Sequence, residues 1–213
     1  EIFKQGIHAQ RGLSCADCHM PYIQEGGIKY TSHHITSPLA NINRTCQTCH
    51  RQSEETLRQN VYERQEKVFD IRNRVEKELA RAHIEAKFAW EKGATEKEME
   101  PILTALRKSQ WRWDYAVASH GASFHAPQEV TRLLGVALNY AQTARIDIAR
   151  VLARHGYSKE VPMPDISTKD KAQSYIGLDM KKLKAQKKNF IDNVVPQWVK
   201  TAKKNGRFIT KEM

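Results

Sequence analysis

The sequence predicts an all-α protein, because apolar residues recur at helical spacing over long stretches and no stretch shows the alternation of a β-strand. The clearest stretch is residues 53–92, where Val61, Val68 and Val75 recur every seven residues and other apolar side chains fill the neighbouring positions. This pattern indicates one long amphipathic helix that ends before Gly93.

Helix start and stop signals delimit two further long helices. Thr95 and Glu98 form a capping box, which predicts a second helix that runs to about Ser119. Pro127 suits the first turn of a third helix, and Gly156 suits its end. The chain therefore predicts long antiparallel helices after its first quarter.

The last part of the sequence contains more proline and lysine. Residues 157–168 include Pro162 and Pro164 close together, which is typical of a surface crossing. A short helix and a longer one over about 179–205 follow, with a kink expected at Pro196.

Residues 1–52 differ from the remainder, 53–213. They hold all four cysteines and show poor periodicity, as expected of loops and short helices wrapped around a cofactor. We therefore expect a cofactor-binding segment at 1–52 and a long-helix region at 53–213 that covers it. The length and charged outer face of the helix at 53–92 also predict packing against another long helix, including its copy in a homodimer.

The formal net charge of +11 does not by itself indicate nucleic-acid binding. Lysine and arginine are spread among acidic residues, and aromatic side chains are not interleaved with them as a base-stacking surface requires. We therefore expect no nucleic-acid partner. No stretch approaches the roughly 20 apolar residues of a membrane span, and no signal peptide is visible.

The chemistry is concentrated in two C-x-x-C-H motifs, Cys15–His19 and Cys46–His50. In such a motif both sulfurs form thioether bonds to haem c and the histidine is the proximal iron ligand. Two motifs with no spare cysteine favour two covalent haems, and a zinc site built from the same residues is the alternative. Because haem is normally attached in this way outside the cytoplasm, a targeting signal is expected to be cleaved or to precede Glu1.

Each iron needs a sixth ligand or an open site, and the other histidines compete for that role. His8 precedes the first motif, His33 lies between the motifs, and His125 lies at a helix entry, so these three are the favoured candidates. The remaining histidines are His34, His83, His120 and His155, of which His83 and His155 are expected to be surface or packing residues.

Several segments together resemble the last two haem segments and the following helices of pentahaem, ammonia-forming cytochrome c nitrite reductase. The similarity spans nearly the whole chain. The segments that carry it are residues 15–22, 30–35, 46–50, 82–86, 93–95, 110–114, 119–121, 125–127 and 164–168.

The resemblance implies a role for each candidate position. Cys15, Cys18 and His19 would hold the fourth haem of the family, with His125 as its distal ligand. The fifth haem would be held by Cys46, Cys49 and His50, with His8 as its distal ligand. His33 matches the distal ligand of the second haem, whose binding motif this sequence does not contain.

The resemblance also implies what lies elsewhere. The family reduces nitrite by six electrons at a first haem with a C-x-x-C-K motif, beside a calcium ion, and none of its catalytic residues maps onto this span. We therefore expect the C-terminal half of a periplasmic, homodimeric enzyme with five haems in total. Its electron donor would be a membrane quinol-oxidising or soluble multihaem cytochrome c. The alternatives are a free-standing dihaem electron carrier and a related reductase of hydroxylamine or sulfur oxyanions.

Overall fold

The computed structural model describes residues 2–119 and 121–207, so that His120 lies outside the described residues. The chain divides into two compact units, Glu1–Val161 and Pro162–Met213. Helices dominate both units, which confirms the predicted all-α class.

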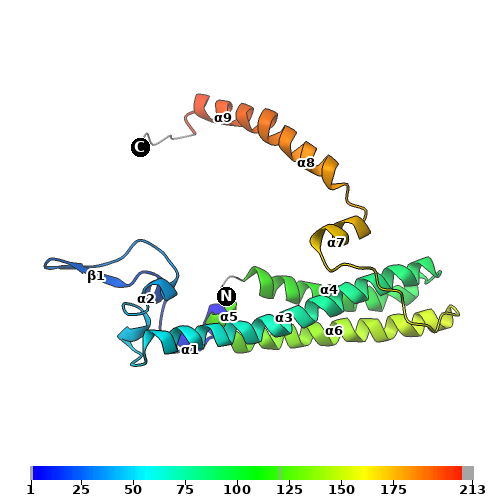
Figure 1. Cartoon of the computed structure of the whole chain (residues 1–213), viewed down its shortest axis with the longest axis horizontal. Helices are drawn as coiled ribbons and strands as arrows, with labels where there is room; N and C mark the ends of the chain where they lie inside the picture. The colour runs from blue at the N-terminus through cyan, green and yellow to red at the C-terminus, as the bar shows by residue number, and fades with distance from the viewer. Residues whose placement is uncertain (1, 120, 208–213) are drawn as a thin grey trace. The chain divides into compact units, whose positions relative to one another are not determined.

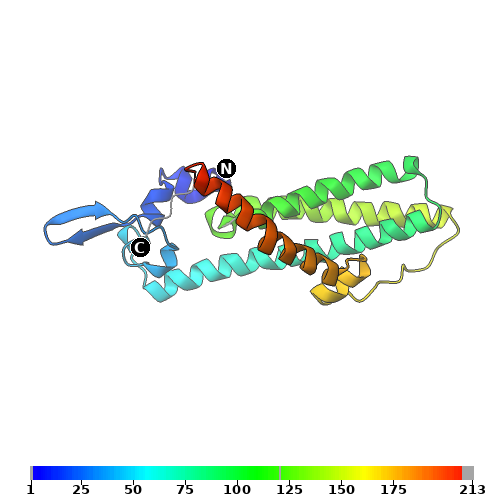
Figure 2. The same cartoon turned by 90° about the horizontal axis from the view of Figure 1, so that it is seen from above.

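Three long helices form the body of the first unit. They are α3 (Glu54–Glu91), α4 (Glu96–Ala118) and α6 (Pro127–Arg154), and the chain reverses direction from each one to the next (Figures 1 and 2). Their bounds agree closely with the predicted helices, because the capping residues and apolar stripes that define them are local features of the sequence.

The apolar stripe of α3 packs inside this bundle. Val68 and Val75 are 4% and 0% exposed and belong to the core shared with α4 and α6. The seven-residue valine repeat therefore does not provide a free face for a second copy of α3. Other members of the core include Leu79, Met99, Ile102, Leu106, Leu134, Ala141 and Ile148.

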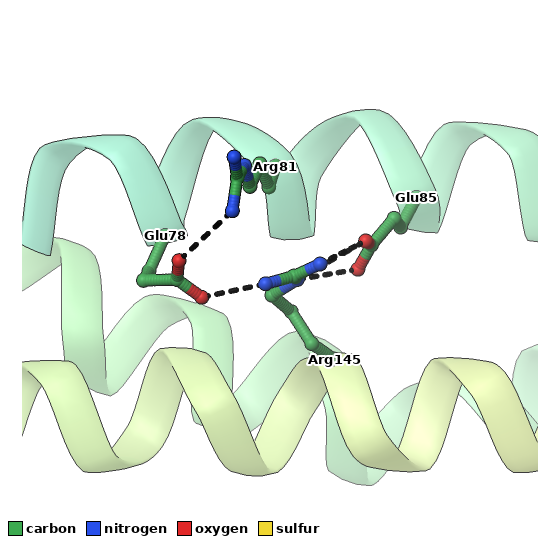
Figure 3. A network of polar contacts seen from close by, with 4 residues as sticks. All are labelled: Glu78, Arg81, Glu85 and Arg145. Atoms are coloured by element: carbon green, nitrogen blue, oxygen red, sulfur yellow. Dashed lines mark hydrogen bonds and ion pairs between the residues drawn. The ribbon is translucent and has the colours of Figure 1, made fainter. Parts of the chain in front are cut away.

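One ion-pair network crosses the bundle between α3 and α6 (Figure 3). Arg145 donates to Glu78 at 2.6 Å and makes a bidentate contact with Glu85, at 2.7 and 2.9 Å. Glu85 is only 8% exposed, and Arg81 also pairs with Glu78. The hydrogen bond to Glu85 is the first cause that raises the pKa of Arg145, so the guanidinium stays charged. The network sets the register of α6 against α3.

The predicted capping box at the start of α4 is present. Glu98 accepts from the backbone N–H of Thr95 at 3.0 Å, and Thr95 Oγ1 accepts from the N–H of Glu98 at 3.4 Å. Glu98 also contacts His155 Nε2 at 3.0 Å and accepts from Arg154 Nε at 3.3 Å. The backbone hydrogen bond from Thr95, followed by His155, lowers the pKa of Glu98 to about 2.

Replacing Glu98 with glutamine is expected to lower the thermal midpoint at pH 7 by about 2–4 °C. Because the folded-state pKa of Glu98 lies below its usual 4.5, its stabilisation is present above pH 4.5 and is lost as pH falls through about 2. Thermal unfolding followed by circular dichroism across this range measures the effect. Glu100→Gln, at an exposed site on the same helix, is the control. If the difference in thermal midpoint between wild type and Glu98→Gln does not become smaller as the pH falls, this account is contradicted.

The segment before α3 consists of short elements at the end of the bundle where α3 begins (Figures 1 and 2). Its strands β1 (Tyr22–Glu25) and β2 (Ile28–Thr31) form an antiparallel hairpin, so the expectation of no strand was wrong here. The Gly26-Gly27 turn carries the missed signal, since a two-residue glycine turn between short runs with aromatic and β-branched residues is typical of a hairpin. The other elements are η1 (Ile2–Gln5), α1 (Ile7–Gln10), α2 (Cys15–His19), η2 (Pro38–Ala40) and η3 (Cys46–Thr48).

The second unit contains α7 (Lys169–Tyr175), α8 (Met180–Asn189), the π-helical turn η4 (Phe190–Val194) and α9 (Val195–Lys204). The π-turn ends two residues before Pro196, which has no backbone N–H to donate, so the predicted irregularity takes this form. None of the helices in the described ranges is long and apolar enough to cross a membrane.

Candidate functional site: two haem motifs and their facing histidines

The first C-x-x-C-H motif is a single helical turn, α2. Ser14 and Asp17 form its capping box, with Asp17 accepting from the backbone N–H of Ser14 at 2.6 Å. Cys15, Cys18 and His19 stand at positions i, i+3 and i+4 of this turn, which share one face of a helix. The local fold therefore presents both sulfurs and the imidazole to one side, as covalent haem attachment requires.

The second motif is also one turn, the 3₁₀ helix η3. The backbone N–H of His50 donates to the carbonyl of Cys46 at 2.8 Å, which brings the histidine back over the first cysteine. Thr45 precedes the turn and is buried, with its hydroxyl donating to the carbonyl of Asn41 at 2.8 Å. This bond fixes the turn to the preceding loop.

The two motifs are neighbours in space. Burial raises the pKa of the Cys18 thiol, and the next cause is the nearby Cys46. All four cysteines are free of disulfides. Within the described ranges, no group of three or more His, Cys, Asp or Glu side chains is arranged to hold a metal ion.

Each motif histidine faces a second histidine. The ring centres of His19 and His125 are 6.2 Å apart with planes at 77°, and those of His8 and His50 are 6.2 Å apart with planes at 76°. His8 belongs to α1, and His125 ends α5 (Ala122–His125). Two pairs with the same geometry therefore form from four separate segments.

These distances test whether haem iron fits between the rings. A bond from a metal to an imidazole nitrogen is about 2 Å long and the ring centre lies about 1.2 Å beyond it, so two imidazoles on opposite sides of one iron have centres about 6.4 Å apart. The observed 6.2 Å in both pairs agrees with this value. Together with the cysteines on the same turns, the residues fit two molecules of haem c with histidine on both faces.

The protein also orients the His19 ring. His19 Nδ1 lies 2.9 Å from the carbonyl oxygen of Thr36, to which a protonated Nδ1 donates. This hydrogen bond leaves Nε2 as the nitrogen with a free lone pair, which is the tautomer needed for an iron ligand. The segment between the motifs thus holds the first motif histidine in place.

Burial lowers the pKa of both facing histidines and so favours their neutral form. It is the first cause that lowers the pKa of His8, followed by the charges of His50 and Arg64. For His125 the pKa is lowered by burial, then by the charges of His19 and His8. Neutral imidazole is the form that binds metals. His8 is among the charges that act on His125, so the two pairs lie close together.

The structure does not bring every favoured histidine into these pairs. His33 lies in the exposed loop after β2, and its predicted role toward a haem bound elsewhere stays a prediction. His83 is exposed on α3, and His155 contacts Glu98. Sequence reasoning missed the residues that support the pairs, such as Thr36, because a backbone carbonyl leaves no signal in the sequence.

A helical bundle with two C-x-x-C-H turns, each facing a second histidine, has the architecture of a c-type cytochrome. The profile of the cytochrome c552 family matches residues 1–208. Cytochrome c-552 of Porphyromonas gingivalis is 69% identical over 209 residues, which are 98% of this chain and 42% of that protein. Cytochrome c-552 of Bacteroides thetaiotaomicron is 64% identical over 211 residues, or 99% of this chain and 43% of that protein. The chain belongs to the cytochrome c552 family.

A solved structure shares the fold. The cytochrome c nitrite reductase of Desulfovibrio desulfuricans, a catalytic subunit described as having two calcium sites, superposes with a TM-score of 0.65 at 29% identity. The match covers 85% of this chain and 36% of that one. This chain therefore spans less than half the length of the relatives it matches.

Proposed function

We propose that this chain is the electron-relay part of a dissimilatory cytochrome c nitrite reductase, which reduces nitrite to ammonia by six electrons. The observation that carries the proposal is the pair of histidine couples, each opposite a C-x-x-C-H turn. With both faces of an iron taken by imidazole, no coordination position is open for a substrate, so such haems transfer electrons. The family and the similarity to a nitrite reductase support this assignment.

Each residue of the site has a part in this function. When bound, haem c supplies a one-electron iron couple. Cys15 and Cys18 would hold one haem, with His19 and His125 as its two histidine ligands. The second haem would have Cys46 and Cys49 as thioether donors and His50 and His8 as axial ligands. The hydrogen bond from His19 to the Thr36 carbonyl fixes the ring, and it would strengthen the ring as an electron donor to iron and so tune the reduction potential of the haem.

The proposed enzyme also needs a catalytic haem, an electron donor and a second subunit. The substrate-binding haem and calcium would lie outside these 213 residues, in a periplasmic protein with five haems. Electrons would arrive from a membrane quinol-oxidising or soluble multihaem cytochrome c. A homodimer is supported by Tyr62 and Phe69 on α3, which are 46% and 43% exposed. These aromatic side chains, and not the buried valine stripe, would form its contact.

The test uses the complete haem-loaded protein that contains this span, reduced under anaerobic conditions and mixed with nitrite. The expected result is reoxidation of the haems with six electrons consumed per nitrite and ammonium as the product. Hydroxylamine and sulfite, supplied separately, test the related-reductase alternative. Haems that stay reduced in the presence of nitrite would overturn the proposal and favour a free-standing electron carrier.

A further inference from the structure

The two facing histidines, His8 and His125, are carried by segments that cross each other. One segment is residues 2–8 and the other is residues 121–125, and they pack together although more than a hundred residues separate them. Gly6 lies at the crossing and is buried, two residues before His8. The crossing therefore connects the two histidine pairs directly.

The backbone contact at this crossing excludes any side chain. A Cβ added to Gly6 would lie 1.7 Å from the carbonyl oxygen of His125 and 2.8 Å from its carbonyl carbon. Both are backbone atoms, so the clash cannot be relieved by a rotamer change. Any residue other than glycine would push the two segments apart.

Each of the two segments also places a phenylalanine side chain against the histidine of the other segment. Phe3, on the segment of His8, meets the ring of His125 edge-on with centres 5.6 Å apart. Phe124, on the segment of His125, lies with its ring centre 5.7 Å from that of His8. Each segment thus supports the histidine of the other.

A second glycine, Gly121, makes room for the ring of His125. A Cβ on Gly121 would lie 2.8 Å from His125 Cε1, and Gly121 has a φ of +73°, which favours glycine. The His125 ring therefore lies against Gly121 and Phe3, while its backbone lies against Gly6.

We infer that Gly6 is a positioning residue that sets the distal histidines of both haems at once. The inference rests on the proposed bis-histidine haems. A shift at Gly6 moves the backbone of His125 and, through the same short segment, His8. One contact therefore determines how firmly both irons are held and links the properties of the two relay centres.

The experiment compares Gly6→Ala with wild type in the complete haem-loaded protein, by titrating cyanide as a competitor for the distal position. Changes in supporting groups around a metal ligand typically weaken metal binding by about 10–100-fold, so cyanide is expected to bind about 10–100-fold more tightly at both haems. Variants His8→Ala and His125→Ala assign the signals of the two haems. Gly27→Ala is the matched control, because a Cβ there meets no atom within 4 Å.

The outcomes separate this inference from the proposed function. A wild type without low-spin bis-histidine haems would refute the proposed function. Wild-type cyanide affinity at either haem in Gly6→Ala would overturn the inference alone. If Gly6→Ala yields no folded holoprotein by circular dichroism, the variants Phe3→Leu and Phe124→Leu test the inference in its place. The expected result is tighter cyanide binding at the haem of His125 for Phe3→Leu and at that of His8 for Phe124→Leu, and unchanged affinity at both haems would overturn the inference.

Discussion

Replacing His125 with alanine is expected to convert the haem held by Cys15, Cys18 and His19 from low-spin to high-spin while it stays covalently attached. The ring centres of His125 and His19 lie 6.2 Å apart, so that His125 would supply the second strong-field nitrogen to the iron of this haem. Without it the iron would keep His19 as its one histidine ligand and would have an open face. The electron paramagnetic resonance spectrum of the oxidised protein measures the change.

His83→Ala is the control for this substitution, because His83 is exposed on α3 and lies outside both histidine pairs. Its spectrum should match that of wild type. Added imidazole should restore the low-spin signal in His125→Ala, because it can occupy the open face. A His125→Ala protein that stays low-spin without an added ligand would show that another residue binds this iron.

Replacing Arg145 with methionine is expected to lower the free energy of unfolding by about 2–3 kcal/mol. The substitution leaves the carboxylate of Glu85, whose side chain is 11% exposed, without its bidentate partner. The Arg145 side chain is 29% exposed, so the expected loss lies below the usual 3–5 kcal/mol for one partner of a fully buried pair. Urea unfolding followed by circular dichroism gives the difference.

Arg132→Met provides a matched control on the same helix. Arg132 also makes a bidentate contact with a glutamate, Glu129, but its side chain is 61% exposed, so the expected loss is below about 1 kcal/mol. The double variant Arg145→Met, Glu85→Met should recover most of the stability, because it removes the unpaired charge as well. Equal losses for Arg145→Met and Arg132→Met would contradict the role given to the network.

The helices could be predicted because their signals are local. The stripe of Val61, Val68 and Val75 and the capping box of Thr95 and Glu98 act within a few turns of the chain, and the structure places α3 and α4 where these signals fall. The partner of the valine stripe could not be predicted, since periodicity shows that a face is buried but not what covers it. Here that partner is α4 and α6 of the same chain.

The candidate site was predictable only in part, because some of its residues are adjacent in the sequence and others meet only through tertiary packing. Cys15–His19 and Cys46–His50 are contiguous, so their chemistry can be read from spacing alone. The pairing of His8 with His50 and of His125 with His19 depends on tertiary packing, and only the resemblance to a family suggested it. Gly6 gave no signal at all, because its importance comes from a backbone that approaches from a segment far away in the sequence.

The most direct test of the central claim, that this span holds two covalently attached haems, is the mass of its two motif peptides after proteolysis of the haem-loaded protein. The peptide that contains Cys15–His19 and the peptide that contains Cys46–His50 should each carry the mass of one haem, bound through both cysteines. Motif peptides with free thiols, a disulfide or no added haem mass would contradict the account.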